Sequence, residues 1–314
     1  KRLFWIQKSY HFCSINSGEY LSANCITIYV FVCCIQKKAL AVHDISCIGR
    51  CSLTVALPIM SAAGIETSVL PTAMLSTHTG GFEGYTFADF TDELPPIAKH
   101  WETLNRKFEC IYSGYLGSEK QIEIVEGLFD TFAAENCIRL VDPVMADNGN
   151  FYSIFNNDFA KRMAGLCSKA DIIIPNITEA CFLLGEEYVE GPYTESYVNN
   201  LLEMLLSFGV KGVVLTGVHF DDYNLGAASL VAGEKPNYYF RKKIDGYYHG
   251  TGDVFGSALG SALLNGFDLA DASRIAVDYT CNCIERTYRE QTDIKYGVNF
   301  ENEIPSLLKL LKII

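Results

Sequence analysis

Residues 38–64 have the sequence KALAVHDISCIGRCSLTVALPIMSAAG, which predicts a strand, a loop and a helix. Residues 38–43 form an apolar extended run, residues 44–52 are rich in turn formers, and residues 53–63 form an apolar helical stretch that ends at Gly64. A buried strand that leads into a helix is the repeating unit of a parallel α/β fold. We therefore expect a sheet with helices packed on it.

The same alternation continues along the chain. The expected strands are 69–75, 110–115, 138–141, 171–175 and 213–216, and the expected helices are 92–106, 158–166, 178–184, 197–208, 254–264 and 270–289, with a final amphipathic stretch at 304–313. One further helix is indicated by apolar residues at helical spacing: Ile122, Val125, Phe129 and Phe132. This alternation predicts a mostly parallel central sheet covered by helices on both faces. Residues 227–231 and 237–244 interrupt the alternation and predict a small antiparallel β flap.

The composition is that of a globular protein. Of 314 residues, 49% are apolar and 20% are charged, which excludes the disordered and low-complexity classes. The net charge of −12 disfavours binding to nucleic acid or to an anionic membrane, because either would need a basic face. The twelve cysteines make up about 4% of the 314 residues, which is below the roughly 8–10% that marks a disulfide scaffold. We therefore expect reduced thiols and a cytoplasmic protein.

Residues 1–35 differ in composition from the rest of the chain. They hold four of the twelve cysteines, three basic residues and one acidic residue. We expect them to be an N-terminal extension outside the fold, followed by a single domain at residues 36–314. The apolar run at residues 26–35 is about half the roughly 20 residues that a membrane span needs. A signal peptide cleaved near residues 39–41 is the alternative, but that cleavage would cut the first predicted strand.

The segment with the most chemical information is HGTGDVF at residues 249–255, where two glycines bracket a threonine at the start of a helix. Backbone amides at a helix N-terminus bind anions. The charge of Asp253 would repel a phosphate bound there, so an aspartate at this position needs a reason. Acting as the general base for a hydroxyl group that attacks a phosphoryl group is such a reason. An ordinary N-cap aspartate is the alternative. The glycines also imitate a dinucleotide fingerprint, but that motif belongs in an opening βαβ unit.

Two further loops with acidic residues follow predicted strands. VDPVMAD at residues 141–147 places Asp142 and Asp147 where they could hold Mg²⁺ through water, and a plain turn is the alternative. IPNITE at residues 174–179 contains Asn176 and Glu179, and the alternative is simple capping of the next helix by Thr178 with a nearby acid. Ligands of open α/β sheets bind outside the carboxyl ends of the strands. All three segments are expected at that edge.

Seven motifs occur in an order that resembles the ribokinase superfamily and, within it, the pyridoxal (vitamin B6) kinase branch: HDISCIGRCS, LSTHTGG, SGYLG, VDPVMAD, IPNITEA, VVLTG and HGTGDVF. The resemblance runs from about residue 37 to the C-terminus. It implies a ribokinase-like three-layer α/β/α sandwich that phosphorylates the 5′-hydroxymethyl group of pyridoxal, pyridoxine or pyridoxamine. ATP and Mg²⁺ are the implied cofactors, with a monovalent cation such as K⁺ as an option, and a homodimer is the implied assembly.

The resemblance also implies a role for individual residues. Asp253 would accept the proton of the hydroxyl group, and residues 221–245 would form the flap over the nucleotide. The resemblance implies an anion hole formed by Gly250, Thr251 and Gly252, and Mg²⁺ binding by Asp142 and Glu179. It implies ATP binding by Asp147, Asn176 and Thr216. The residues implied at the vitamin are Asp44, Ser46, His78, Thr79 and Tyr115, with Tyr152 as a neighbour.

The first loop leaves the substrate open. Many family members have a serine followed by a histidine where this chain has His43-Asp44, so the hydrogen bonds to the pyridine ring differ. The short loop is also similar to that of the hydroxymethylpyrimidine kinases of thiamine synthesis, whose substrate carries the same hydroxymethyl group. A vitamin-binding protein without turnover is the third alternative.

Overall fold

A nine-stranded sheet forms the centre of the computed structural model, which describes residues 36–314. Its strand order is β11-β10-β9-β8-β5-β4-β1-β2-β3. The bounds are β1 Lys38–Ile48, β2 Glu66–Thr77, β3 Phe87–Asp89, β4 Phe108–Ser113, β5 Ala133–Val141, β8 Ile172–Ile173, β9 Gly212–Val218, β10 Asn224–Val231 and β11 Asn237–Lys242. The strands from β2 to β9 in this order are parallel, which confirms the expected sheet. The predictions for residues 1–35 lie outside the described residues.

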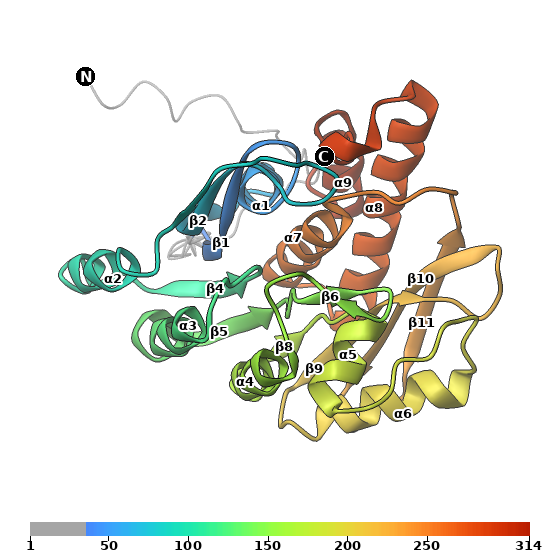
Figure 1. Cartoon of the computed structure of the whole chain (residues 1–314), viewed down its shortest axis with the longest axis horizontal. Coiled ribbons are helices and arrows are strands. Elements are labelled where there is room, and N and C mark those ends of the chain that lie inside the picture. The colour runs from blue at the N-terminus through green and yellow to red at the C-terminus, as the bar shows by residue number, and fades with distance from the viewer. Residues whose placement is uncertain (1–35) are drawn as a thin grey trace, which may run out of the picture. The chain divides into compact units, whose positions relative to one another are not determined.

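Helices cover both faces of this sheet, as Figure 1 shows. One face carries α2 Leu94–Glu102, α3 Glu119–Phe132, α4 Asn157–Cys167, α5 Ile177–Leu184 and α6 Glu195–Leu206, and the other carries α1 Leu53–Ala62, α7 Thr251–Leu264, α8 Leu269–Glu290 and α9 Ile304–Leu310. Alternate residues of β1 enter the two cores, since Leu40 packs on the first face and Ala41 on the second. The predicted three-layer sandwich is confirmed. Among residues 36–314, no helix combines the length and apolar character needed to cross a membrane.

Helix α3 shows how the sequence pattern forms these layers. The side chain of Ser118 caps the helix by accepting a hydrogen bond from the Gln121 amide. The four apolar residues that predicted this helix are all buried against the sheet: Ile122, Val125, Phe129 and Phe132. Each such side chain contributes about 1.5–3 kcal/mol when fully buried. The spacing therefore identified the packed face correctly.

The segment expected to form a separate β flap is part of the central sheet in the structure. Strands β10 and β11 pair antiparallel, as predicted, but β10 also pairs with β9, so both strands extend the central sheet. Residues 227–230 are buried without interruption, so this run lacks the polar face that a free flap would present. A two-stranded hairpin instead forms between β6, Ala146–Asp147, and β7, Asn150–Phe151. The short antiparallel strand β3 was also not predicted.

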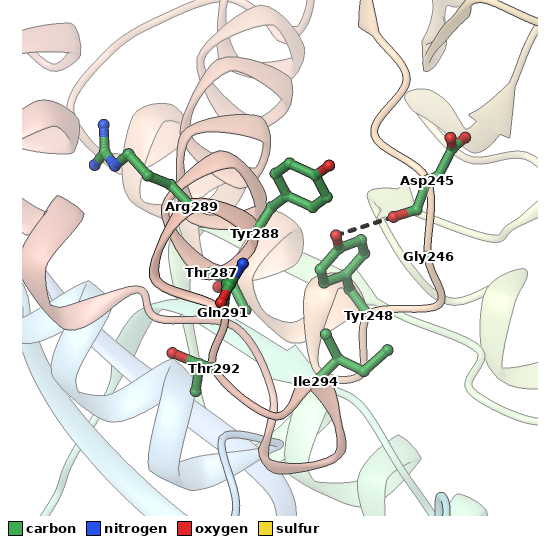
Figure 2. Close-up of a pocket in the computed structure, with 9 residues that line it drawn as sticks. All are labelled: Asp245, Gly246, Tyr248, Thr287, Tyr288, Arg289, Gln291, Thr292 and Ile294. Carbon is green, nitrogen blue, oxygen red and sulfur yellow. Dashed lines mark hydrogen bonds between the residues drawn. The ribbon is translucent and has the colours of Figure 1, made fainter.

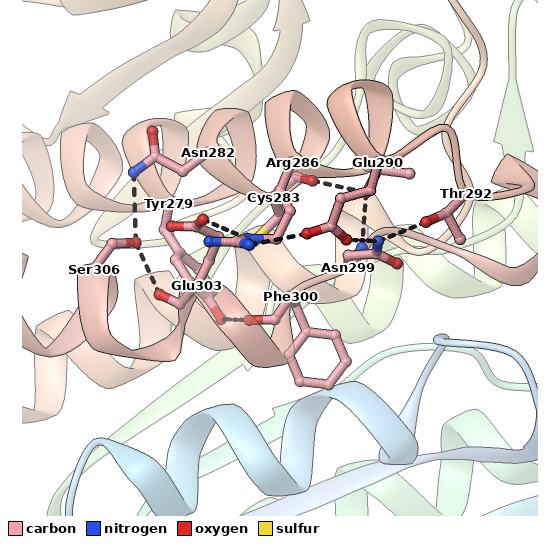
Figure 3. Close-up of polar contacts among 11 residues, drawn as sticks. Tyr279, Asn282, Cys283, Arg286, Glu290, Thr292, Asn299, Phe300, Glu303 and Ser306 are labelled. Atoms are coloured by element: carbon pink, nitrogen blue, oxygen red, sulfur yellow. Dashed lines mark hydrogen bonds and ion pairs between the residues drawn. The ribbon is translucent and has the colours of Figure 1, made fainter.

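The C-terminal segment is fastened to α8 by a polar network, which Figure 3 shows. Arg286 donates to Glu290 at 3.0 Å and to Glu303 at 2.6 Å. The amide of Asn299 donates to Glu290 and to Thr292, both at 2.7 Å. These bonds hold the chain that follows α8 against that helix, where Val298 and Phe300 are buried in the core shared with α1.

Candidate active site

The N-terminus of α7 is a group of backbone donors at the carboxyl edge of the sheet. Gly250 is the N-cap residue with φ of 74°, and a Cβ at this position would lie 2.0 Å from the carbonyl oxygen of Arg50. Only glycine fits there. Within the described part of the chain, no side chain caps this turn, and the Thr251 hydroxyl donates to the Tyr248 carbonyl at 3.1 Å. The first-turn amides are therefore available to an anion.

Asp253 does not cap this helix. It stands in the first turn of α7, three residues after the N-cap Gly250, so the N-cap interpretation is wrong. Its side chain is 16% exposed. Burial raises the pKa of Asp253 to about 7, while a backbone hydrogen bond at Ser52 opposes this rise. A carboxyl group with this pKa exchanges a proton near neutral pH.

Two further carboxyl groups lie close to Asp253. Asp142 follows β5, and a Cβ on Gly252 would lie 3.9 Å from its Oδ2 atom. Burial raises the pKa of Asp142 well above its usual range, and the charges of Glu179 and Asp253 raise it further. Burial also raises the pKa of Glu179 to about 8. Three neighbouring acids without a cation each disfavour the charged form of the others.

Glu179 and Asn176 form the capping box of α5. The Asn176 side chain accepts from the Glu179 amide, and the Glu179 carboxylate accepts from the Asn176 amide, both at 2.9 Å. The other Glu179 oxygen accepts from the Met145 amide at 3.1 Å. Helix α5 is therefore capped, but by Asn176 and Glu179 and not by Thr178, the residue that the sequence suggested. The same bonds also fix the loop after β5 against α5, which places Glu179 beside Asp142.

The chemistry of this acidic group fits Mg²⁺ only in part. Carboxylate oxygens are its preferred protein ligands, but Mg²⁺ keeps several waters and is commonly shared with phosphate oxygens. Residues 36–314 contain no cluster of three or more His, Cys, Asp or Glu side chains placed to hold a metal ion. Since backbone amides occupy both oxygens of Glu179, Asp142 is the carboxylate most available to an ion.

The residues expected at the ATP phosphates come from three separate segments. Asn176 forms a parallel bridge with Thr216, so these two residues are adjacent. Asp147, in β6, accepts a hydrogen bond from the Tyr247 hydroxyl at 2.8 Å. From the sequence, Tyr247 and Tyr248 are only a pair that could stack on a ring or simply pack. The contact of Tyr247 with Asp147 was not predicted, because the two residues lie 100 positions apart. The charges of Glu179 and Asp147 add to burial in raising the pKa of Tyr152, so Tyr152 lies beside this acidic group.

The residues expected at the vitamin form a second polar group. Asp44 is buried and accepts hydrogen bonds from the hydroxyl groups of Ser46 and Ser52. Burial raises the pKa of Asp44 to about 6, and these hydrogen bonds oppose the rise. Burial raises the pKa of Tyr115, and the Asp44 charge adds to this rise. Ser52 was not predicted as a site residue.

His78 uses both ring nitrogens within the protein. Its Nδ1 atom accepts from the Gly80 amide at 3.2 Å, so Nε2 donates to the Lys295 carbonyl at 2.7 Å. The ring also packs on His249 with 5.0 Å between centroids. His78 therefore orients its loop instead of offering a free nitrogen, while the adjacent Thr79 is exposed.

A cavity of about 460 Å³ adjoins this edge, and Figure 2 shows it between the loop before α7 and the end of α8. Tyr248 lines it and donates to the Asp245 carbonyl at 3.1 Å. Tyr248 also connects this lining to α7, because its carbonyl oxygen accepts from the hydroxyl of Thr251 in the first turn of that helix. The carboxyl groups of Asp142, Glu179 and Asp253 do not line it.

Comparison with known families agrees with this geometry. The family model described as "Phosphomethylpyrimidine kinase" matches residues 92–298, which include the acidic loops and the anion hole. The chain belongs to the phosphomethylpyrimidine kinase family. The predicted resemblance to pyridoxal kinases of the ribokinase superfamily is confirmed by this match and by the chain's similarity to pyridoxal kinases.

Relatives of this kinase-family chain fall into two groups by substrate. The pyridoxal kinase of Dictyostelium discoideum is 25% identical over 82% of this chain and 89% of its own length. The hydroxymethylpyrimidine/phosphomethylpyrimidine kinase of Aquifex aeolicus is 27% identical over 52% of this chain and 64% of its own length. The family therefore establishes a phosphotransferase, while its substrates include two different rings.

Solved structures show the same division. A putative phosphomethylpyrimidine kinase from Bacteroides thetaiotaomicron is 35% identical with a TM-score of 0.84, covering 88% of this chain and 96% of that chain. A second crystal form of that protein, with pyridoxal, is 36% identical, has a TM-score of 0.82 and covers 87% of this chain and 96% of that one. The pyridoxal kinase of Lactobacillus plantarum is 28% identical with a TM-score of 0.81, covering 88% and 98%. The ribokinase-like fold is confirmed.

Proposed function

We propose that this protein transfers the γ-phosphoryl group of MgATP to the 5′-hydroxymethyl group of pyridoxal, pyridoxine or pyridoxamine. One observation carries the proposal: the carboxyl group of Asp253 stands in the same helical turn as the free amides of residues 251–252, next to the buried Asp142. This juxtaposes a base with an anion site. Family membership supports the kinase chemistry, and the related structure with pyridoxal supports a B6 vitamer.

In the proposed reaction, Asp253 accepts the proton as the substrate hydroxyl oxygen attacks phosphorus. One O–P bond forms, the bond from phosphorus to the ADP oxygen breaks, and ADP keeps that electron pair. The amides of Gly250, Thr251 and Gly252 would stabilise charge on the transferring group, a contribution that is commonly large. The pKa of about 7 leaves Asp253 part ionised at neutral pH, which suits a general base.

The acidic loops would bind the metal and the nucleotide. Asp142 would hold Mg²⁺ together with phosphate oxygens and water, and Glu179 would contribute through water, since its oxygens accept from backbone amides. Bound Mg²⁺ supplies positive charge beside the phosphates. Asp147, Asn176 and Thr216 would face the phosphates from three neighbouring segments. A K⁺ site, the nucleotide flap, the homodimer and the cytoplasmic location stay predictions.

The vitamin would bind on the first loop. Asp44, Ser46 and Tyr115 offer a carboxyl group and two hydroxyl groups to a pyridine ring and its substituents. His78 would shape the loop around the ring, because its nitrogens already bind Gly80 and Lys295.

Hydroxymethylpyrimidine kinase is the second candidate, favoured by the description of the family model. Steady-state kinetics with MgATP on the three B6 vitamers and on hydroxymethylpyrimidine decides between them. We expect the highest kcat/KM for a B6 vitamer, and a preference for the pyrimidine would overturn the substrate assignment. Tight vitamer binding without ATP consumption would indicate a non-catalytic binding protein.

We also propose residues 36–314 as a single kinase domain. A chain that begins at Gln36 should match the full chain in kcat and in Tm if residues 1–35 are dispensable. A large loss of either would contradict this boundary.

A further inference from the structure

His43 occupies a fully buried position next to Asp253. It lies in β1, has no exposed surface, and its Nδ1 atom is 3.9 Å from Asp253 Oδ1. Neither ring nitrogen has a hydrogen-bond partner among the described residues. Burying such a group without a partner costs free energy of folding. An apolar residue would fit this core position at less cost, so the imidazole calls for a functional explanation.

The neighbours of His43 hold the ring in one place. Tyr112 stands edge-on to it, with 4.4 Å between the ring centroids and an angle of 78°. A Cβ on Gly114 would lie 2.1 Å from His43 Nδ1, so only glycine at that position leaves room for the ring. The imidazole is thus confined between β4 and the first turn of α7. Its Nδ1 edge faces the carboxylate of Asp253.

The chemistry of the ring determines what it can do there. Burial lowers the pKa of His43 to about 3, so the imidazole is neutral and carries one N–H. A neutral ring of this kind is a poor proton acceptor but a good hydrogen-bond donor. The gap of 3.9 Å between His43 Nδ1 and Asp253 Oδ1 exceeds an N–H···O hydrogen bond by about 1 Å, so a bond between them requires the Asp253 side chain to shift by about that distance.

We propose that His43 is a positioning residue for Asp253: its Nδ1–H donates to the carboxylate and fixes the orientation in which that carboxylate accepts the substrate proton. The inference rests on the proposed function, because that function names Asp253 as the base. His43 does not contact the substrate in this scheme. It exchanges no proton and acts only through the carboxylate.

Two substitutions that differ in whether a hydrogen-bond donor remains test this role. His43→Asn keeps a donor near the position of Nδ1, whereas His43→Leu keeps the volume and removes the donor. We expect His43→Leu to lower kcat at least about tenfold, with KM for ATP and for the vitamer within about threefold and Tm unchanged or higher. His43→Asn should recover most of kcat. Wild-type kcat in His43→Leu would overturn the proposal, as would equal losses of kcat and Tm in both variants.

His100 provides the matched control, because it is an exposed histidine on α2. His100→Asn and His100→Leu should both leave kcat and KM unchanged. A change in these controls would show that replacing a histidine anywhere perturbs the enzyme, and would remove the support drawn from His43.

A second measurement does not depend on turnover. Long-range ¹H–¹⁵N NMR spectra of the full chain report which imidazole nitrogen carries the proton, and the signal missing from His43→Asn identifies His43. We expect the Nδ1–H tautomer, and an Nε2–H tautomer would overturn the proposal. If the wild-type protein turns over no vitamer, the proposed function fails, and the tautomer still decides the inference about His43.

Discussion

Two groups of acidic side chains in this protein have opposite surroundings. At the candidate active site, Asp142 and Glu179 are buried, and no lysine or arginine of residues 36–314 pairs with either. In the network of Figure 3, Glu290 pairs with Arg286 on the outer side of α8. Burial raises the pKa of Glu179 to about 8, whereas the bonds from Arg286 and Asn299 hold the pKa of Glu290 below its usual value. The same chemical group is thus buried with a raised pKa in one region and paired with an arginine at a lowered pKa in the other.

The largest effect should follow from removing the carboxylate that faces the anion hole. Asp253→Asn keeps the size of the side chain but removes the base, so kcat should fall at least about 10²-fold. ATP binding, measured by calorimetry, should stay nearly the same. Turnover like that of the wild type would exclude Asp253 as the base. The buried acids would then differ from the paired Glu290 in pKa without a demonstrated role in catalysis.

The buried acids should also make stability depend on pH. In metal-free protein, the pKa values of Asp44, Asp253 and Glu179 are raised to about 6, 7 and 8. Between about pH 4 and pH 8 the folded state therefore binds more protons than the unfolded state, and the free energy of unfolding falls as pH rises. This stabilisation is complete below the unfolded-state pKa values and is lost by about pH 8.

Asp253→Asn should reduce this fall between pH 5 and pH 8 by at least about 1 kcal/mol, measured by urea unfolding in EDTA. We take a modest figure because the Asp253 side chain is 16% exposed. Asp130→Asn, at an exposed position on α3, is the control and should leave the pH dependence unchanged. Parallel curves for Asp253→Asn and wild type would contradict the raised pKa.

The smallest effect should come from the C-terminal network. Tyr279 is fully buried, and its hydroxyl donates to the Phe300 carbonyl at 3.1 Å. Tyr279→Phe should cost about 1 kcal/mol of unfolding free energy, equally at pH 5 and pH 8, because a neutral hydrogen bond is lost. kcat should stay within about twofold. A large loss of kcat would mean that this network supports the active site as well as the fold.

The sequence predicted what depends on local pattern. The strand and helix alternation and the buried face of α3 followed from spacing, and the acidic loops followed from their positions after strands. Contacts between distant segments were not predictable. Tyr247 meets Asp147 only because the hairpin β6–β7 faces the loop before α7, and His43 meets Asp253 only because β1 lies beneath α7.

For the β10–β11 pair and for the loop with Asn176 and Glu179, the sequence pattern allowed more than one set of structural partners. An antiparallel pair at β10 and β11 was predictable, but its attachment to β9 required knowing that helices cover both faces of residues 227–230. Asn176 and Glu179 suited both a metal loop and a helix cap, and the structure shows the cap. A role of these two residues in nucleotide binding does not follow from the sequence pattern, because the pattern does not include the position of a bound nucleotide.

The order of the helices along the chain has a consequence for synthesis. Helix α1 is translated before α7, α8 and α9, yet its residues Val55, Ala56 and Ile59 pack in a core that these three later helices complete (Figure 1). The opposite layer, from α2 to α6, is complete before then. A nascent chain therefore carries an uncovered apolar face on one side of its sheet until α7–α9 emerge, which is the state that chaperones bind and proteases degrade. Shortened chains that lack α7–α9 would keep that face permanently.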